Sequence, residues 1–284
     1  MMIKDFITSG CTGSPINPAP GDPQRCAYRK MEIKIKSSDE LNKLLDALAL
    51  EIVDANIYHR LYTDLVDSIK DNARGFTQSN TFWSFTIDSL HDAQMIRLCR
   101  VFDQESKTLN LFNLLETIKA NVQFFDQKYF RQRLKDNAFV DSLAEVDRIP
   151  NESQLQKDIW FASDQNPLVK KLMIWRNNII AHRGAKVSLG KDEILADNSL
   201  SQQEIETLLN ESFTIFNRYS SLYRASTWSR TVVGHDDYKS LLKFLNLGLQ
   251  KWDEDIKKEL QELKNGHNKT LQRMAHSHRS PKSL

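Results

Sequence analysis

Four residues near the middle of the chain carry side chains that could together act on a phosphate ester. Arg176 is followed directly by Asn177 and Asn178, and His182 comes four residues after Asn178. An arginine guanidinium can hold a phosphate through paired hydrogen bonds, and a histidine imidazole gains or loses a proton near neutral pH. We therefore expect any chemistry of this protein to occur in this segment.

These groups suit the cleavage of RNA without a metal ion, because the 2′-hydroxyl of RNA is a built-in nucleophile. His182 can remove or supply the required proton, which contributes roughly 10²–10⁴-fold to such a rate. Arg176 can stabilise the charge of the phosphorane. Asn177 or Asn178 can orient the phosphate or the imidazole. The products would end in a 2′,3′-cyclic phosphate and a 5′-hydroxyl.

The spacing of the motif adds a geometric condition. In an α-helix, six residues place Arg176 and His182 about 9 Å apart along the axis and about 120° apart around it. The two side chains converge either if the helix frays before His182 or if a twofold partner supplies half of the site. In-line displacement needs a base and an acid on opposite sides, and an isologous dimer provides two copies of His182. We favour a composite site at a dimer interface.

A purely structural role is the alternative for the same residues. A histidine near a helix C-terminus interacts with the helix dipole, and an arginine there pairs with a carboxylate. Trp175 could stack a base, although core packing is the simpler role. Arg183 follows the motif directly. Arg97, Arg100 and Asp103 could line the same cleft, but we favour an intrahelical ion pair between Arg100 and Asp103.

Composition restricts the possible classes of protein. The chain has 284 residues, 40% hydrophobic and 27% charged, with a formal net charge of only +2, so any affinity for nucleic acid must come from local patches. We find no apolar run long enough to span a membrane and no export signal. Three widely spaced cysteines, Cys11, Cys26 and Cys99, indicate a reducing compartment and no zinc site. We expect a cytoplasmic protein without a metal or other cofactor.

Helical periodicity dominates the sequence between a leader and a tail. Residues 1–36 contain most of the prolines and predict a disordered leader, in which Met31 would be the natural start. Apolar residues at three- and four-residue steps predict a long helix over 39–73, ended by Ala73, Arg74 and Gly75. Asn166 and Pro167 predict the start of the helix that carries Arg176.

Further helices complete the expected organisation. We predict helices near 80–103, 109–118, 155–161, 167–182, 202–226 and 236–264, and a less regular helical segment over 124–148. The fold class is all-α, a bundle of antiparallel helices over 37–230 with an extra C-terminal helix. Residues 265–284 read as a disordered basic tail, in which His267, His276 and His278 are solvated. His59 and His91 are expected to be solvated or core histidines.

The motif and its context resemble the HEPN superfamily. Arg176 and His182 are separated by five residues, with Asn177 after the arginine and Ala181 before the histidine. The earlier segments Phe82–Phe85 and Arg97–Asp103 are similar to the second helix of the abortive-infection AbiU-like branch. The resemblance extends over about residues 38–230.

The resemblance implies a dimeric helical bundle and, in many members, a metal-independent endoribonuclease. Its catalytic residues would be Arg176 and His182, assisted by Asn177, Asn178 and Arg183. Such proteins act in antiviral defence or toxin–antitoxin growth arrest, so RNA and an antitoxin or other defence protein are the expected partners. The alternative is a non-catalytic HEPN module that binds RNA, a nucleotide or a protein.

Overall fold

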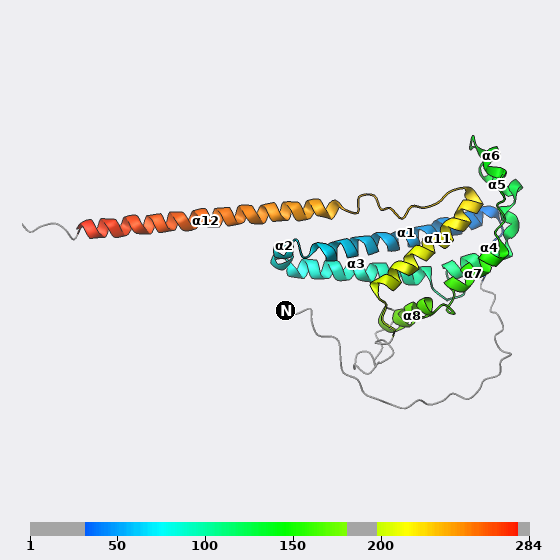
Figure 1. Ribbon diagram of the computed structural model, residues 1–284, viewed down its shortest axis with the longest axis horizontal. Coiled ribbons are helices and arrows are strands. Elements are labelled where there is room, and N and C mark those ends of the chain that lie inside the picture. The colour runs from blue at the N-terminus through cyan, green and yellow to red at the C-terminus, as the bar shows by residue number, and fades with distance from the viewer. Residues whose placement is uncertain (1–31, 181–197, 278–284) are drawn as a thin grey trace, which may run out of the picture. The chain divides into compact units, whose positions relative to one another are not determined.

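The computed structural model describes residues 32–180 and 198–277, with side chains for residues 32–178 and 198–269. Within these ranges the chain is helical and contains no strand (Figure 1). This confirms the all-α fold class. The leader lies outside the described residues up to residue 31, so the disorder of that part and the role of Met31 remain predictions. Its last residues, 32–36, are instead ordered on the bundle: the backbone N–H of Ile33 donates to the hydroxyl of Thr117 at 2.8 Å, and Ile35 packs against the core.

Two long antiparallel helices form the base of the bundle. Helix α1 (Ser38–Ser68) packs along α3 (Asn80–Val101), with the short α2 (Ala73–Gln78) between them. The expected helix over 39–73 therefore ends five residues early. At this end the carbonyl of Ser68 accepts two hydrogen bonds from Asn72, one from its backbone N–H at 3.2 Å and one from its side-chain amide at 2.9 Å.

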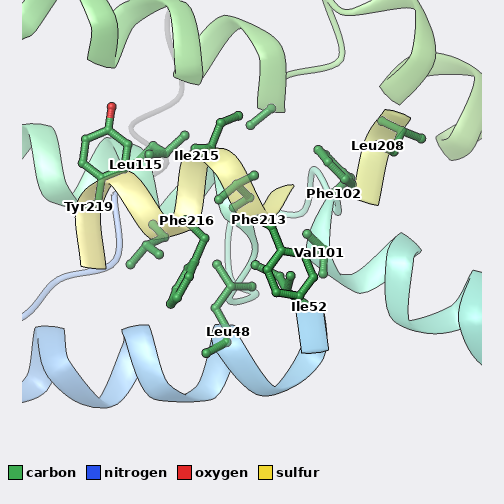
Figure 2. Packing of buried hydrophobic residues seen from close by; sticks show 14 of the residues in the cluster. Leu48, Ile52, Val101, Phe102, Leu115, Leu208, Phe213, Ile215, Phe216 and Tyr219 are labelled. Atoms are coloured by element: carbon green, nitrogen blue, oxygen red, sulfur yellow. The ribbon is translucent and has the colours of Figure 1, made fainter. Parts of the chain in front are cut away.

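Helix α11 (Gln202–Arg224) brings the largest buried side chains into the core. Phe213 and Phe216 extend from α11 towards Leu48 and Ile52 of α1 (Figure 2). All four side chains are at most 2% exposed. Complete burial of such side chains stabilises a fold by about 1.5–3 kcal/mol each, so this contact fixes α11 on the α1–α3 pair.

A group of shorter helices closes one side of the bundle. These are α4 (Leu111–Ala120), the 3₁₀ helix η1 (Val122–Phe125), α5 (Gln127–Arg133), α6 (Val140–Ala144) and α7 (Glu152–Ala162). The guanidinium groups of Arg133 and Arg148 donate to the carbonyls of Tyr223 and Ser221, at 2.6 and 2.7 Å. Two cations thus satisfy the carboxyl end of α11, where the helix dipole is negative.

Polar caps fix where the helices begin. Ser37, Asn166 and Ser201 each accept a hydrogen bond from a backbone N–H two or three residues later. At Ser201 the carboxylate of Glu204 also accepts from the backbone N–H of Ser201, at 2.8 Å, completing a capping box. These starts agree with the sequence predictions.

The last helix is longer than expected. Helix α12 (Asp237–Ser277) is unbroken through residues 265–277, which we had assigned to a disordered tail (Figure 1). Its first turns pack against the bundle, where Leu242 joins Leu65, Phe76 and Trp83 in a second apolar cluster.

Gly75 lies where α2 meets α12. A Cβ at this position would come within 2.7 Å of Cδ2 of Leu245, so a larger residue here would force the Leu245 side chain to shift. Gly75, which we expected to end the first helix, instead allows the approach of the last one.

Candidate functional site

Helix α8 (Pro167–Trp175) positions the arginine of the motif. Its apolar face, made by Val169, Leu172 and Met173, is buried in the core. After Trp175 the backbone widens into a π-helix over Arg176–Ile180. A π turn bonds each residue to the fifth one along the chain and is often found at functional sites. Arg176 is therefore the first residue of a widened turn that follows a firmly packed helix.

Arg176 faces an acidic residue from another element. Its Nη1 lies 3.1 Å from Oδ1 of Asp103, whose side chain is only 10% exposed, whereas that of Arg176 is 34% exposed. The expected intrahelical pair between Arg100 and Asp103 is wrong. Asp103 lies beyond the end of α3 at Val101, so helical spacing no longer determines its neighbours.

The loop after α3 holds the Asp103 carboxylate in place. Oδ1 accepts from the backbone N–H groups of Gln104 and Glu105 at 2.8 and 3.2 Å, and Oδ2 accepts from the hydroxyl of Thr108 at 3.2 Å. These bonds fix the orientation of the carboxylate independently of its contact with Arg176. The cation is thus oriented by a rigid acceptor while part of it stays in contact with solvent.

Arg97 and Arg100 pair with α1 instead of joining this site. Nη1 of Arg97 lies 2.9 Å and Nη1 of Arg100 3.5 Å from Oε1 of Glu51, and Nη2 of Arg97 lies 3.3 Å from Asp54. Neither arginine lines the pocket beside Arg176. Their role is to tie α3 to α1.

The neighbours of Arg176 in the motif have different surroundings. Asn177 lines a pocket together with Arg176. The side-chain amide of Asn178 donates to the carbonyl of Ile174 at 2.8 Å, which satisfies backbone at the α-to-π junction. Trp175 packs against the core cluster and meets the ring of His91 edge-on at 6.0 Å. The structure thus gives Trp175 the simpler of its two expected roles, which is packing against the core.

A pocket of about 470 Å³ opens beside Arg176 and Asn177. It is formed by the loop after α3, the carboxyl half of α8 and the start of the π turn. Its charged lining residues are Asp103, Glu105, Asp164, Lys170 and Arg176. The pocket is large enough for a small ligand or part of a nucleotide, and its carboxylates outnumber its cations.

His182 and Arg183 lie outside the described residues. Their positions relative to Arg176, and to a twofold axis, stay predictions. The α-helical arithmetic that separated Arg176 and His182 by about 120° does not apply to a π turn, because a wider turn rotates the chain less per residue.

A larger pocket lies elsewhere in the described part of the chain. It measures about 990 Å³ and lies near the start of α1, lined by Lys36, Lys43 and Arg133 among others. The Arg133 guanidinium donates to Ser38, Phe124 and Tyr223. Burial lowers the pKa of this group. Arg133 is thus occupied in holding three elements together, and this pocket shares no residue with the motif.

His59 belongs to a buried polar network that sequence reasoning missed. Its Nδ1 lies 2.9 Å from Oε1 of Gln94, and its Nε2 lies 2.7 Å from Oε2 of Glu206. Arg230 donates to the other oxygen of Glu206 at 2.8 Å. Burial raises the pKa of Glu206, but the bonds from Arg230 and His59 outweigh it and lower the pKa overall. The network joins α1, α3 and α11, and no local pattern in the sequence reveals it.

Cys99 is buried, as expected, close to the Arg176–Asp103 pair. Burial raises the pKa of its thiol to about 12, opposed in part by the positive charge of Arg176. At pH 8 only about one thiol in 10⁴ would be ionised. We expect iodoacetamide to leave Cys99 unmodified in the native protein and to alkylate it in denaturant, as measured by peptide mass spectrometry. Rapid native labelling of Cys99 would contradict its burial.

The described part of the chain offers neither a metal site nor a membrane-spanning helix. Residues 32–180 and 198–277 contain no group of three or more histidine, cysteine or acidic side chains placed to hold a metal ion. In the same ranges no helix is long and apolar enough to cross a bilayer.

The helical bundle, together with a helix that carries the Arg176 motif on its carboxyl side, defines a HEPN-type domain. The family model HEPN_AbiU2, described as AbiU2, matches residues 38–244. The chain therefore belongs to the AbiU2 family of HEPN domains, a module related to abortive infection. The match covers the whole bundle and the first turns of α12. No curated protein and no solved structure matches the chain.

Proposed function

We propose that the protein is a metal-independent endoribonuclease that acts in antiviral defence or toxin–antitoxin growth arrest in the cytoplasm. His182 is the general acid and base, and Arg176 stabilises the phosphorane. Asn177 lines the same pocket, while Arg183 adds positive charge next to His182. Asn178, bonded to the backbone of α8, supports the turn. The observation that carries this proposal is the presentation of Arg176 to solvent at the edge of a pocket, anchored by Asp103.

The contact with Asp103 leaves Arg176 able to bind a phosphate. A guanidinium has five N–H donors, and the contact at 3.1 Å uses Nη1. The remaining donors can approach phosphate oxygens. Because Asp103 is itself held by the loop after α3, the guanidinium does not have to be ordered during the reaction, which is the advantage of a preorganised electrostatic site.

The charge of the pocket supports a composite dimeric site. Asp103, Glu105 and Asp164 outnumber Lys170 and Arg176, so one pocket alone is a weak binder of phosphate. A second copy related by a twofold axis, docked through the motif helices, would add its own Arg176 and His182. The second pocket also brings its own three carboxylates, so the gain is a second guanidinium and a second imidazole beside the RNA backbone and not a positive net charge.

An assay of RNA cleavage in EDTA tests the proposal. We expect the purified dimer to cut RNA and leave 2′,3′-cyclic phosphate and 5′-hydroxyl ends. A substrate methylated at the reacting 2′-oxygen should be resistant, because it lacks the nucleophile. His182→Ala should reduce cleavage at least 10²-fold, the usual contribution of a general acid or base.

A second histidine variant serves as the matched control. Nδ1 of His235 donates to the carbonyl of Val232 at 2.7 Å, near the start of α12, and this residue has no place in the proposed site. His235→Ala should retain cleavage. If the wild-type protein retains RNA on a filter but does not cut it, the non-catalytic binding module is the correct alternative. Full activity in His182→Ala would refute the assignment of the catalytic group.

A further inference from the structure

Helix α12 contains an eleven-residue repeat. The segments Leu249–Trp252, Leu260–Leu263 and Leu271–Met274 each consist of leucine, glutamine, a charged residue and a large apolar residue. They are spaced by eleven residues. A third apolar position, Ile256, follows the first segment. This pattern is confined to the last helix and does not depend on the proposed function of the bundle.

The repeat aligns apolar residues in one stripe along α12. Eleven residues make three turns at 3.67 residues per turn, close to the pitch of an undistorted α-helix. Leu249, Trp252, Ile256, Leu260 and Leu263 follow steps of three, four, four and three residues. Such a stripe runs almost parallel to the helix axis and favours a coiled coil with a slight right-handed supercoil.

The bundle covers only the beginning of this stripe. Leu249 is 8% exposed, next to the cluster around Leu242. Beyond it, Trp252, Ile256, Leu260 and Leu263 are 48%, 39%, 52% and 70% exposed. An apolar stripe of this length on a soluble surface usually marks an interaction site.

The charges that border the stripe indicate what covers it. At about 98° per residue, Glu259 and Lys264 lie roughly 65° to either side of the middle of the stripe. They are five residues apart and so cannot pair along one helix, where partners are three or four apart. In a parallel, in-register pair of helices, a residue on one border faces the residue five positions later on the other border. Glu259 then faces Lys264 of the second copy, and the symmetry makes this contact twice.

An antiparallel pair is less favourable for the same residues. It places each border of the stripe against the same border of the second helix. Glu259 would then face its own border on the second copy, where it meets the other Glu259. Asp253, which shares the border of Lys264, is already paired with Arg74 of the bundle and is not free to offset this repulsion.

We propose that the exposed stripe of α12 binds the same stripe of a second copy of this chain in a parallel coiled coil. The overlap from Trp252 to Ser277 is about 39 Å long, from the rise of 1.5 Å per residue. A parallel pair also places both bundles at the same end of the coil. This arrangement follows from α12 alone and holds whether or not the protein cleaves RNA.

Charge reversal tests both the pairing and its direction in the full-length chain. E259K and K264E should each weaken dimerisation about tenfold, because two attractive contacts become repulsive. An equimolar mixture of the two variants should associate with each other as tightly as wild type, since each contact again joins opposite charges. Sedimentation equilibrium or light scattering measures the masses.

The matched controls lie on the opposite face of α12. Glu254 and Lys258 are about 160° from the middle of the stripe, so E254K and K258E should leave the mass distribution unchanged. Leu260→Asp with Leu263→Asp should weaken association at least 100-fold by burying charge in the seam. A helical circular dichroism spectrum like that of wild type confirms that the bundle is folded in each variant.

Three outcomes would overturn the proposal. The first is a wild-type chain that is monomeric at all accessible concentrations. The second is a double aspartate variant that dimerises as well as wild type, which would locate the interface elsewhere. The third is a mixture of E259K and K264E that associates no better than either alone, which would exclude a parallel pair. The first outcome would also exclude the dimer proposed for the nuclease, whereas the second and third concern α12 alone and leave the motif helices untested.

Discussion

Arg176→Ala should reduce RNA cleavage about 10²- to 10³-fold, the effect expected from removing one preorganised charge-stabilising group. Arg176→Lys should recover only part of this loss, because an ammonium cannot reproduce the planar fork that holds both a phosphate and the Asp103 carboxylate. Single-turnover cleavage of a labelled RNA, compared with filter binding of the same RNA, separates the loss of rate from the loss of affinity.

Asp103→Asn tests how the arginine is positioned. Asparagine has nearly the same shape but lacks the charge that faces Arg176 at 3.1 Å. We expect a lower cleavage rate with little change in RNA affinity, because Asp103 orients the guanidinium and does not itself touch the phosphate. An unchanged rate in Asp103→Asn would show that the ion pair is only structural.

Mixing two inactive variants tests whether the site is shared between subunits. Arg176→Ala and His182→Ala chains are mixed, denatured together and refolded to allow exchange. If arginine and histidine act across a twofold axis, part of the dimers contain one intact pair, and cleavage returns to a measurable fraction of wild type. A mixture as inactive as its components would exclude a site that needs only one arginine and one histidine from opposite subunits.

Asp158→Ala should destabilise the fold by about 3 kcal/mol, because it removes a buried carboxylate that accepts from three side chains, while Arg218 remains 32% exposed to solvent. Asp158 is 4% exposed. Its Oδ2 accepts from the hydroxyl of Tyr219 at 2.6 Å and pairs with Arg218, while Oδ1 accepts from Gln154 at 2.9 Å. Burial raises the pKa of Tyr219 and the bond to Asp158 raises it further, so its hydroxyl remains a donor at physiological pH.

Tyr219→Phe is the matched control for this network. It removes the hydroxyl but leaves Asp158 its bonds to Arg218 and Gln154. The expected cost is about 1 kcal/mol, that of one hydrogen bond. Urea unfolding followed by circular dichroism measures both variants. If Asp158→Ala costs no more than Tyr219→Phe, the ion pair contributes little and the tie between α7 and α11 is mainly apolar.

Periodicity and caps made most of the helices predictable. The apolar residues of α1 and the caps at Ser37, Asn166 and Ser201 act through neighbours at most four residues away, so the sequence contains all the information needed. The end of α1 was harder to predict. The helix ends at Ser68, whose carbonyl accepts from both the backbone and the side chain of Asn72, although the apolar pattern continues past this point at Ile69.

The partner of Arg176 could not be predicted, because it comes from a different part of the chain. Helical spacing suggested Arg100 as the partner of Asp103, but that rule holds only inside a helix, and α3 ends at Val101. The buried network of His59, Gln94 and Glu206 could not be predicted for the same reason, because its members come from three different helices, α1, α3 and α11. Contacts of this kind follow from packing and have no local signature.

The extent of α12 was underestimated for a different reason. The absence of acidic residues after Glu262 suggested a solvated tail. The apolar stripe nevertheless continues through Leu271 and Met274, and the helix reaches Ser277. For residues 265–277 the charge composition indicated a disordered tail, whereas the eleven-residue spacing indicated a continued helix. The structure agrees with the spacing.

The π turn at Arg176–Ile180 has a consequence for how this family could change over time. Such a turn holds one residue more than the α-helical turn it replaces. Deleting a single residue within the turn would restore a regular α-helix and change the direction in which the chain continues. Val169, Leu172 and Met173 precede the turn and would keep their places in the core. The loss or gain of one codon is thus enough to reorient the part of the motif that follows Arg176 without disturbing the helical domain that supports it.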